Sequence, residues 1–377
     1  MRRTADAIVI GAGIAGSATA YYLAQMGQRV LLLDRAFPCS GSTGRCIGGV
    51  RAQFTHDLTV RLMIENIGIF RTLGEELGRS VEWFQGGYLL LAHSEEKQRT
   101  YEQAIGIQRR YGLNVTYISA AECRKVVPDL NPDGLLGGAF CPTDGQANPF
   151  YTVYGLIDRM KELGGKLLDY TEVAAINTRS GRVVSVTTAQ GDELSAPVVV
   201  VATGPWLAET GRLLGLDIPV QAERHESLVT EAVERMFDPM LVDYRADGCY
   251  FIQNYGTGHF IGCYTPIPNV PGFDITASDE FISEMPGRMT RLVPALKPVR
   301  VIRHWAGSYE MTPDGNPIAG LTPVQGCYVI GGMCGHGFML GPALGKHVAE
   351  MAVKGRSSVN LDEFALDRTF GKAETLK

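Results

Sequence analysis

Three glycines near the start of the chain, Gly11, Gly13 and Gly16, follow a short apolar run. Their spacing lets the chain turn tightly, lets its backbone approach a ligand closely, and lets the following helix pack against the preceding strand. The N terminus of that helix would direct free N–H groups at an anion such as a pyrophosphate. A second apolar run ends in Asp34, whose carboxylate can accept a hydrogen bond from a ribose hydroxyl. The pattern therefore predicts a dinucleotide-binding site.

A second glycine loop, Gly335-His336-Gly337-Phe338, lies near the other end of the chain and opens another helix. A flavin benefits from a second helix N terminus, because the dipole stabilises its anionic reduced pyrimidine by about 0.3–2 kcal/mol. The segment Ser42-Thr43-Gly44 follows the ribose-binding acid, where hydroxyls can reach the pyrophosphate of an extended FAD. FAD is therefore expected, and a plain NAD dehydrogenase is the alternative.

The elements that must position these loops follow from the apolar spacing. Helices are predicted over 14–26, 56–77, 94–111, 151–163, 279–292 and 339–353, and strands over 29–33, 87–92, 166–169 and 327–330. The β-branched run within 197–204 indicates a strand buried on both faces, as in a parallel sheet. Alternating strands rich in Tyr and Phe over 219–311 indicate an antiparallel sheet. The polar tail after Gly355 is expected to be loosely held.

These elements predict an α/β chain with two domains. One is a discontinuous, Rossmann-like FAD-binding domain with a parallel sheet, assigned to 1–82, 143–218 and 320–377. The other is an α+β substrate domain with an antiparallel sheet, assigned to 83–142 and 219–319.

Composition narrows the class of protein. The chain has 377 residues, of which 45% are hydrophobic and 20% charged, as in soluble globular proteins. A net charge of −5 without a long basic run argues against nucleic-acid partners, and no apolar window is long enough for a transmembrane segment. The eight cysteines show neither a C-x-x-C pair nor metal-ligand spacing, so we expect reduced thiols, no metal and a cytoplasmic location.

Four motifs, spread in order over nearly the whole chain, carry a family resemblance. They are Ser42-Thr43-Gly44-Arg45 with Gly49-Val50-Arg51, Ala202-Thr203-Gly204-Pro205-Trp206, Met311-Thr312-Pro313-Asp314-Gly315, and Gly335-His336-Gly337-Phe338. The chain resembles the D-amino-acid oxidase superfamily, especially glycine oxidase, sarcosine oxidase, and the β subunits of heterotetrameric sarcosine oxidase and dye-linked proline dehydrogenase. The resemblance implies FAD, an amine or amino-acid substrate, and hydride transfer from the carbon next to nitrogen to the flavin. Water then hydrolyses the imine product.

The resemblance also implies roles for particular residues. Arg51 matches an arginine that grips the substrate carboxylate, which a guanidinium does with two parallel hydrogen bonds. Tyr250, Tyr264 and Tyr309 fall at substrate-pocket positions, and Arg51, Tyr250 and His336 are the candidate catalytic residues; a surface arginine, core aromatics and a packing histidine are the alternative readings. The expected cofactor-binding residues are Gly11, Gly13, Ile14, Ala15, Gly16, Asp34, Arg35, Ser42, Thr43, Gly44, Gly49, Val50, Val173, Ala202, Thr203, Gly204, Trp206, Gly307, Gly332, Gly335, His336, Gly337, Phe338 and Met339.

Departures from the family pattern bear on the reaction. Gly307 stands where monomeric sarcosine oxidase has the cysteine that binds FAD covalently, so noncovalent FAD is expected. Phe260 takes the place of an oxygen-activating lysine, and Met339 that of a carboxylate-binding lysine. Tyr309 replaces a carboxylate-binding arginine of glycine oxidase, and Pro149 the histidine that carries FMN in tetrameric sarcosine oxidases. Together these departures favour a dehydrogenase over an oxidase.

The expected function is oxidation of a small, secondary amino acid such as proline, hydroxyproline or sarcosine, with electrons passed to an acceptor other than oxygen. One alternative is an oxidase of glycine, sarcosine or a D-amino acid that produces hydrogen peroxide. Another is a flavin-bearing subunit that works only with iron–sulfur or flavin partner subunits. His225 is a further candidate near the domain junction, although a solvated strand end explains it equally well.

Overall fold

The computed structural model describes residues 3–371 and 373–376. Its first lobe is built on a six-stranded sheet in the order β19-β20-β13-β2-β3-β9, and every neighbouring pair is parallel except β19 with β20. The strands are β2 (Ala7–Ile10), β3 (Val30–Leu33), β9 (Lys166–Leu168), β13 (Val198–Val201), β19 (Ile318–Leu321) and β20 (Cys327–Gly331). The predicted parallel sheet of an α/β fold is therefore confirmed.

Side chains of the central strands alternate between two apolar cores, as the period of a strand requires. Ala7 and Val9 belong to the core that contains α1 (Ile14–Gln25), α5 (Pro149–Glu162) and α8 (Gly337–Lys354). Ile8 and Ile10 belong to the core on the other face, under a four-stranded sheet. That sheet consists of β1 (Arg3–Thr4), β12 (Glu193–Ser195), β11 (Arg182–Thr188) and β10 (Val173–Arg179). Burial of both faces explains the continuous apolar runs.

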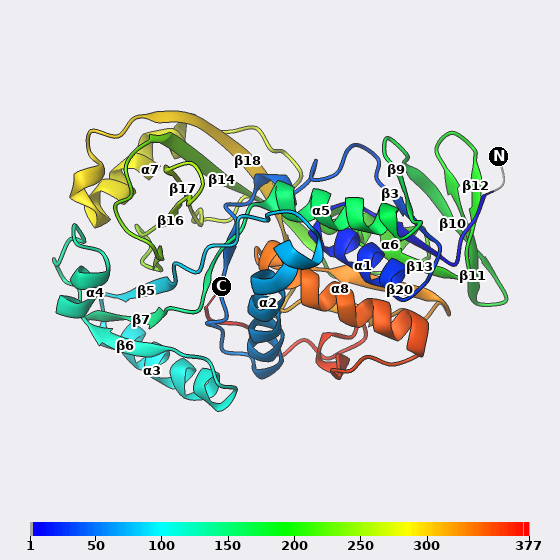
Figure 1. Cartoon of the computed structure of the whole chain (residues 1–377), viewed down its shortest axis with the longest axis horizontal. Helices are drawn as coiled ribbons and strands as arrows, with labels where there is room; N and C mark the ends of the chain where they lie inside the picture. The colour runs from blue at the N-terminus through cyan, green and yellow to red at the C-terminus, as the bar shows by residue number, and fades with distance from the viewer. Residues whose placement is uncertain (1–2, 372, 377) are drawn as a thin grey trace.

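The second lobe contains an eight-stranded sheet in the order β18-β14-β17-β16-β15-β5-β7-β6, antiparallel except between β15 and β5. Its strands are β5 (Tyr88–Ala92), β6 (Thr116–Ser119), β7 (Gly137–Cys141), β14 (Gln221–Ala232), β15 (Met240–Asp243), β16 (Tyr250–Gln253), β17 (His259–Tyr264) and β18 (Val301–Met311). Its helices are α3 (Glu95–Arg110), α4 (Ala120–Val126) and α7 (Asp279–Leu292). Figure 1 shows this lobe beside the first, with α7 over β16 and β17. The exact domain boundaries stay a prediction.

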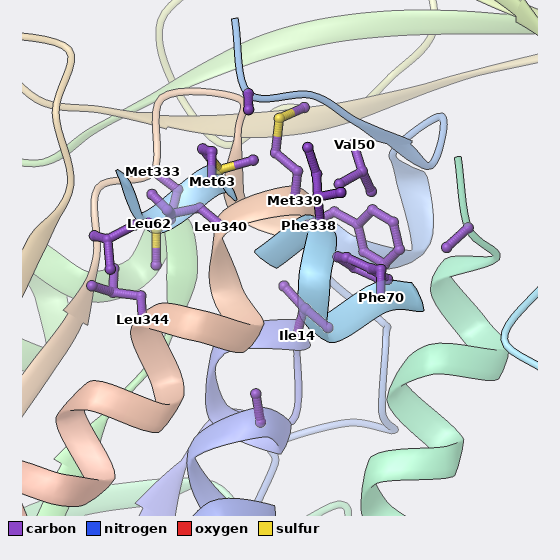
Figure 2. Close-up of a cluster of buried hydrophobic side chains, with 14 of the residues drawn as sticks. Ile14, Val50, Leu62, Met63, Phe70, Met333, Phe338, Met339, Leu340 and Leu344 are labelled. Atoms are coloured by element: carbon purple, nitrogen blue, oxygen red, sulfur yellow. The ribbon is translucent and has the colours of Figure 1, made fainter. Parts of the chain in front are cut away.

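Helix α2 (Asp57–Glu76) fixes the start of α8. Leu62, Met63 and Phe70 of α2 are fully buried, and they meet side chains from the first turn of α8, namely Phe338, Met339 and Leu340 (Figure 2). Ile14, at the start of α1, belongs to the same cluster (Figure 2). The N termini of α1 and α8 are therefore held in one apolar core. The remaining short elements are β4 (Gly49–Val50) paired with β8 (Gly145–Gln146), and α6 (Leu207–Arg212).

The predicted helix bounds agree with the structure to within two residues. The largest difference that bears on function concerns α8, which begins at Gly337 rather than at Met339. The second glycine loop therefore ends in the first turn of the helix.

The prediction of a loosely held tail after α8 is wrong. Leu361, Phe364 and Leu376 are 4%, 0% and 1% exposed. Arg368 forms a bidentate ion pair with the buried Asp314, with Nε–Oδ2 at 3.0 Å and Nη2–Oδ1 at 2.9 Å. Widely spaced apolar residues within polar sequence have no helical or strand period, so the tail gave no sign of its packing.

Two absences apply to the described part of the chain. No helix there is long and apolar enough to cross a membrane. Likewise, residues 3–371 and 373–376 contain no group of three or more His, Cys, Asp or Glu side chains placed to hold a metal ion.

Candidate functional site

The predicted dinucleotide turn joins β2 to α1, and its glycines meet different requirements. Gly11 has a φ of +106°, and a Cβ there would lie 2.3 Å from the carbonyl oxygen of Ala202, which follows β13. A Cβ on Gly16 would lie 1.9 Å from the Gly11 carbonyl oxygen, so this glycine lets the helix pack onto the turn. Gly13 is the N-cap of α1 and lines a cavity, so the helix starts at an open space.

Two side chains hold this turn from outside. Asp34, directly after β3, accepts hydrogen bonds from the N–H groups of Ala12 at 2.7 Å and Ala36 at 2.9 Å. Thr43 Oγ1 accepts a hydrogen bond from the N–H of Ile14 at 3.1 Å. Both Asp34 and Thr43 also line the cavity. The carboxylate therefore stabilises the turn itself, a role that the sequence did not reveal.

A single cavity of about 1180 Å³ is lined by residues of both lobes. Its volume exceeds the roughly 300–1,000 Å³ of ordinary small-molecule sites. All four predicted substrate-binding residues, Arg51, Tyr250, Tyr264 and Tyr309, border it. The predicted cofactor-binding residues that line it are Gly11, Gly13, Ile14, Ala15, Asp34, Arg35, Ser42, Thr43, Gly49, Val173, Ala202, Thr203, Gly204, Trp206, Gly307, Gly335, His336, Gly337, Phe338 and Met339.

Four predicted cofactor-binding residues lie behind this lining rather than in it: Gly16, Gly44, Val50 and Gly332. Val50 is fully buried in the helical core, and Gly44 packs so closely that a Cβ would lie 2.2 Å from a loop carbonyl oxygen. Gly332 donates its N–H to Glu310 Oε2 at 3.0 Å. In this structure they support the residues that face the cavity.

Tyr250 on β16 and Tyr309 on β18 form an aromatic wall in the second lobe. Their hydroxyl oxygens are 2.8 Å apart and hydrogen-bonded. The imidazole of His225, on β14, stacks on the Tyr309 ring with centroids 3.7 Å apart and an interplanar angle of 15°. Burial lowers the pKa of His225 to about 4, and its Nδ1 has no hydrogen-bond partner among the described residues. The imidazole that lines this cavity is therefore neutral and can accept a hydrogen bond.

Arg51 follows β4 and is only 3% exposed, yet it lines the cavity. Its guanidinium donates hydrogen bonds to the carbonyl oxygens of Gln53 and Leu376. It also donates to the hydroxyl of Tyr244 at 3.2 Å. His336 Nε2 lies 3.3 Å from the same terminal nitrogen, Nη2. The structure thus brings together Arg51 and His336, two predicted catalytic residues that are far apart in the sequence.

The Arg51–His336 contact lies at the start of α8, because His336 is the N-cap of that helix. The first turn of α8 contains no acidic residue, and among the described residues the N-cap position makes no side-chain hydrogen bond to the helix N–H groups. The helix N terminus therefore adds a partial positive charge to that of the guanidinium. This end of the cavity is suited to anionic groups.

Among the charged residues of the cavity lining that the sequence analysis did not single out are Glu310 and Arg245. Burial raises the pKa of Glu310 to about 7, although its carboxylate accepts a hydrogen bond from Gly332. Arg245 is held by the buried carboxylate of Asp243, with Nη2–Oδ2 at 2.7 Å. Glu310 could have been noticed in the sequence, because it is the single acidic residue in the otherwise uncharged stretch 305–313, next to Tyr309. Arg245 lies in a polar loop, where nothing in the sequence distinguishes it from other exposed arginines.

Strand β17 places Tyr264 in the cavity lining and Phe260 outside it. The ring of Tyr264 stacks on Phe281 of α7 with centroids 5.1 Å apart, and Arg288 covers it at 3.9 Å. Phe260 is fully buried in the same α7 cluster and does not line the cavity. The inference that Phe260 stands in place of an oxygen-activating lysine therefore has no structural support.

Asp144 is a fully buried carboxyl group next to the Arg51 segment. Its Oδ1 accepts the N–H of Ala52 at 3.1 Å, and its Oδ2 has no hydrogen-bond partner among the described residues. Burial raises the pKa of Asp144 from 3.8 to about 7. Between these two values the folded protein retains a proton that the unfolded chain releases. This group therefore lowers the free energy of unfolding increasingly as pH rises through that window.

We expect Asp144→Asn to stabilise the protein, and to do so more at pH 8 than at pH 5, by a difference of about 1–3 kcal/mol. The amide keeps an acceptor for Ala52 and cannot ionise. Thermal unfolding of both proteins at the two pH values measures the effect. An equal shift in Tm at pH 5 and pH 8 would show that Asp144 is not a carboxyl group with a raised pKa.

The family description "DAO: FAD dependent oxidoreductase" matches residues 6–351, and the chain belongs to this family. It is 28% identical to sarcosine oxidase subunit beta of Rhodobacter capsulatus, over 96% of this chain and 88% of that protein. It is also 28% identical to mitochondrial sarcosine dehydrogenase of Mus musculus, over 97% of this chain but only 41% of that protein. The crystal structure of L-proline dehydrogenase from P. horikoshii has a TM-score of 0.92 and 32% identity, covering 97% of this chain and 98% of that one.

Family membership confirms the prediction of an FAD-dependent oxidoreductase and removes the NAD alternative. The residues present fit this cofactor. The backbone at Gly13 has little room for a side chain, since a Cβ there would lie 3.2 Å from Thr43 Oγ1, which itself holds the N–H of Ile14. Asp34 and the N terminus of α8 border the same cavity, so one ligand can reach both.

Proposed function

We propose that this protein oxidises the C–N bond of a small, secondary amino acid of the proline, hydroxyproline or sarcosine type, and that its electrons go to an acceptor other than oxygen. The observation that carries the proposal is the buried guanidinium of Arg51 in the same cavity as the Tyr250–Tyr309 pair. A carboxylate would accept two parallel hydrogen bonds from this desolvated guanidinium. The relatives named for sarcosine and L-proline support this substrate class.

In this proposal the side chains act mainly by positioning. Bound FAD supplies the hydride acceptor. Arg51 holds the carboxylate, and the Tyr250–Tyr309 wall limits the size of the substrate and excludes water. The neutral imidazole of His225 accepts a hydrogen bond from the substrate amine. The N terminus of α8 favours negative charge that develops near it.

The cationic side chains that line the cavity support an electron acceptor other than oxygen. No lysine is among the described residues that line it, so no flexible ammonium is available there to stabilise superoxide. Arg245 is paired with Asp243, and Arg35 lies over the ring of Trp206 at 3.8 Å. Arg45 donates hydrogen bonds to the carbonyl oxygens of Ser40 and Gly41. These three guanidinium groups are engaged with protein groups, and in this proposal Arg51 holds the substrate carboxylate.

A specific observation favours the alternative of a subunit in a larger assembly. Ile267, Phe273 and Ile275 border the cavity and are 74%, 41% and 42% exposed. Contiguous exposed apolar residues often mark a protein interface. The relative from R. capsulatus is itself named as a subunit of sarcosine oxidase.

The purified holoprotein should be mixed without oxygen with single amino acids, including proline, hydroxyproline, sarcosine and glycine, while flavin absorbance is followed. We expect a small secondary amino acid to bleach the flavin, and an artificial dye to restore the colour faster than air does. Rapid recovery in air with stoichiometric hydrogen peroxide would instead identify an oxidase. If no amino acid or amine bleaches the flavin of the lone chain, and a co-purified partner restores activity, the subunit alternative holds.

A further inference from the structure

The segment 373–376 contacts Arg51 on the side away from the cavity. The carbonyl oxygen of Leu376 accepts a hydrogen bond from Arg51 Nη2, and the Leu376 side chain is 1% exposed within the helical core. Neither Glu374 nor Leu376 lines the cavity, whereas Arg51 and Tyr244 do. The guanidinium therefore lies between this segment and the cavity. Figure 1 shows the red segment 373–376 beside α2, where the two lobes meet.

Glu374 anchors the segment. The side chain is 4% exposed, and its two carboxylate oxygens accept hydrogen bonds from the N–H groups of Thr55 at 3.0–3.1 Å, His56 at 3.0 Å and Leu376 at 2.9 Å. Thr55 and His56 directly precede α2, so the carboxylate also lies at the positive end of that helix. A carboxylate that accepts several N–H bonds holds its chain in one conformation. In that conformation, the carbonyl of Leu376 meets Arg51.

We infer that this segment is part of the carboxylate-binding machinery: the Leu376 carbonyl, held by Glu374, positions the Arg51 guanidinium for the substrate. The inference rests on the carboxylate-binding role proposed for Arg51. A long arginine side chain loses rotamer entropy when its guanidinium is fixed, and acceptors that already hold its outer N–H groups reduce what remains to be lost on binding. Glu374 and Leu376 touch neither substrate nor cofactor in this scheme and are positioning residues.

Glu374→Gln tests the inference, because it preserves the shape of the side chain but turns an amide NH₂ toward N–H donors. Asp367→Asn is the matched control, since Asp367 lies in the same tail and its side chain is exposed. The probe is pyrrole-2-carboxylate, a flat carboxylate that cannot be oxidised at a C–H bond next to nitrogen as an amino acid is. Pyrrole is its carboxylate-free counterpart. Both are titrated into the holoproteins while the flavin spectrum is followed.

Glu374→Gln is expected to raise the Kd for pyrrole-2-carboxylate about tenfold, in line with loss of one hydrogen bond to a charged group. FAD content and pyrrole binding of Glu374→Gln, and carboxylate binding by Asp367→Asn, should stay within twofold of the wild-type values. An unchanged Kd for the carboxylate, or an equal loss for both probes, overturns the inference.

A second variant keeps the test decisive if Glu374→Gln does not fold. Leu376→Ala retains the backbone carbonyl but removes its buried anchor, and the same selective loss of carboxylate affinity is expected. Failure of the proposed function gives a different result: the wild-type holoprotein would not bind the carboxylate more tightly than pyrrole. That result would show that Arg51 does not bind the substrate carboxylate, and it would overturn this inference as well.

Discussion

Arg51→Ala is expected to lower kcat/KM for the amino-acid substrate by about 30- to 5,000-fold, equivalent to about 2–5 kcal/mol. The guanidinium is 3% exposed and is the group proposed to pair with the substrate carboxylate. Its removal leaves that carboxylate desolvated without a cation, so most of the loss should fall on KM. Steady-state assays with an artificial electron acceptor measure both constants.

Two further variants make this result specific. Arg51→Lys retains the charge but lacks the planar fork of donors, so a loss smaller than that of Arg51→Ala is expected. Arg61→Ala, which removes an exposed arginine of α2, should leave kcat/KM unchanged. An Arg51→Ala enzyme with unchanged KM would remove Arg51 from the substrate site.

Gly16→Ala is expected to yield a protein that purifies largely without FAD, with a Kd for the cofactor raised at least about 100-fold. The new Cβ would lie 1.9 Å from the Gly11 carbonyl oxygen, so the turn that binds the pyrophosphate has to move. A shift of this kind removes several hydrogen bonds to a charged group, each worth about 1.5–3 kcal/mol. The ratio of flavin to protein absorbance, and reconstitution with added FAD, measure the loss.

Gly106→Ala is the matched control, because Gly106 is also inside a helix, α3, and a Cβ there would have nothing within 4 Å. This variant should bind FAD normally and gain about 0.5–1 kcal/mol in stability from the better helix former. Full FAD content in Gly16→Ala would contradict the account of the turn. Loss of FAD from both variants would point to general destabilisation instead.

The parallel sheet and both glycine loops could be predicted from the sequence because their signals are local. The apolar run of β2, the glycines after it and the acid after β3 are contiguous, and each reports a backbone requirement within its own segment. The helix bounds were equally accessible, since buried residues recur at helical spacing along α2 and α7.

The burial of Phe260 could not be predicted, because it depends on which face of β17 this residue occupies. β14 and β17 pair with a register shift between Val229 and Ala232, and Phe260 on β17 faces the α7 core. A shift of one residue in the alignment moves every strand residue to the opposite face of the sheet. Sequence similarity at this level therefore does not fix which residues of β17 face the cavity. The packing of the tail could not be predicted for another reason. Glu374 and Leu376 are held by hydrogen bonds to partners more than 300 positions away in the sequence.

The most direct test of the proposed reaction compares an amino acid with the same amine lacking its carboxylate. Flavin reduction of the holoprotein is followed without oxygen, with L-proline against pyrrolidine and sarcosine against dimethylamine. The account predicts rapid bleaching by at least one of the amino acids and much slower bleaching by its carboxylate-free partner, a difference that disappears in Arg51→Ala. Equal rates for the two members of each pair would contradict carboxylate recognition by Arg51, and thus the proposed substrate class.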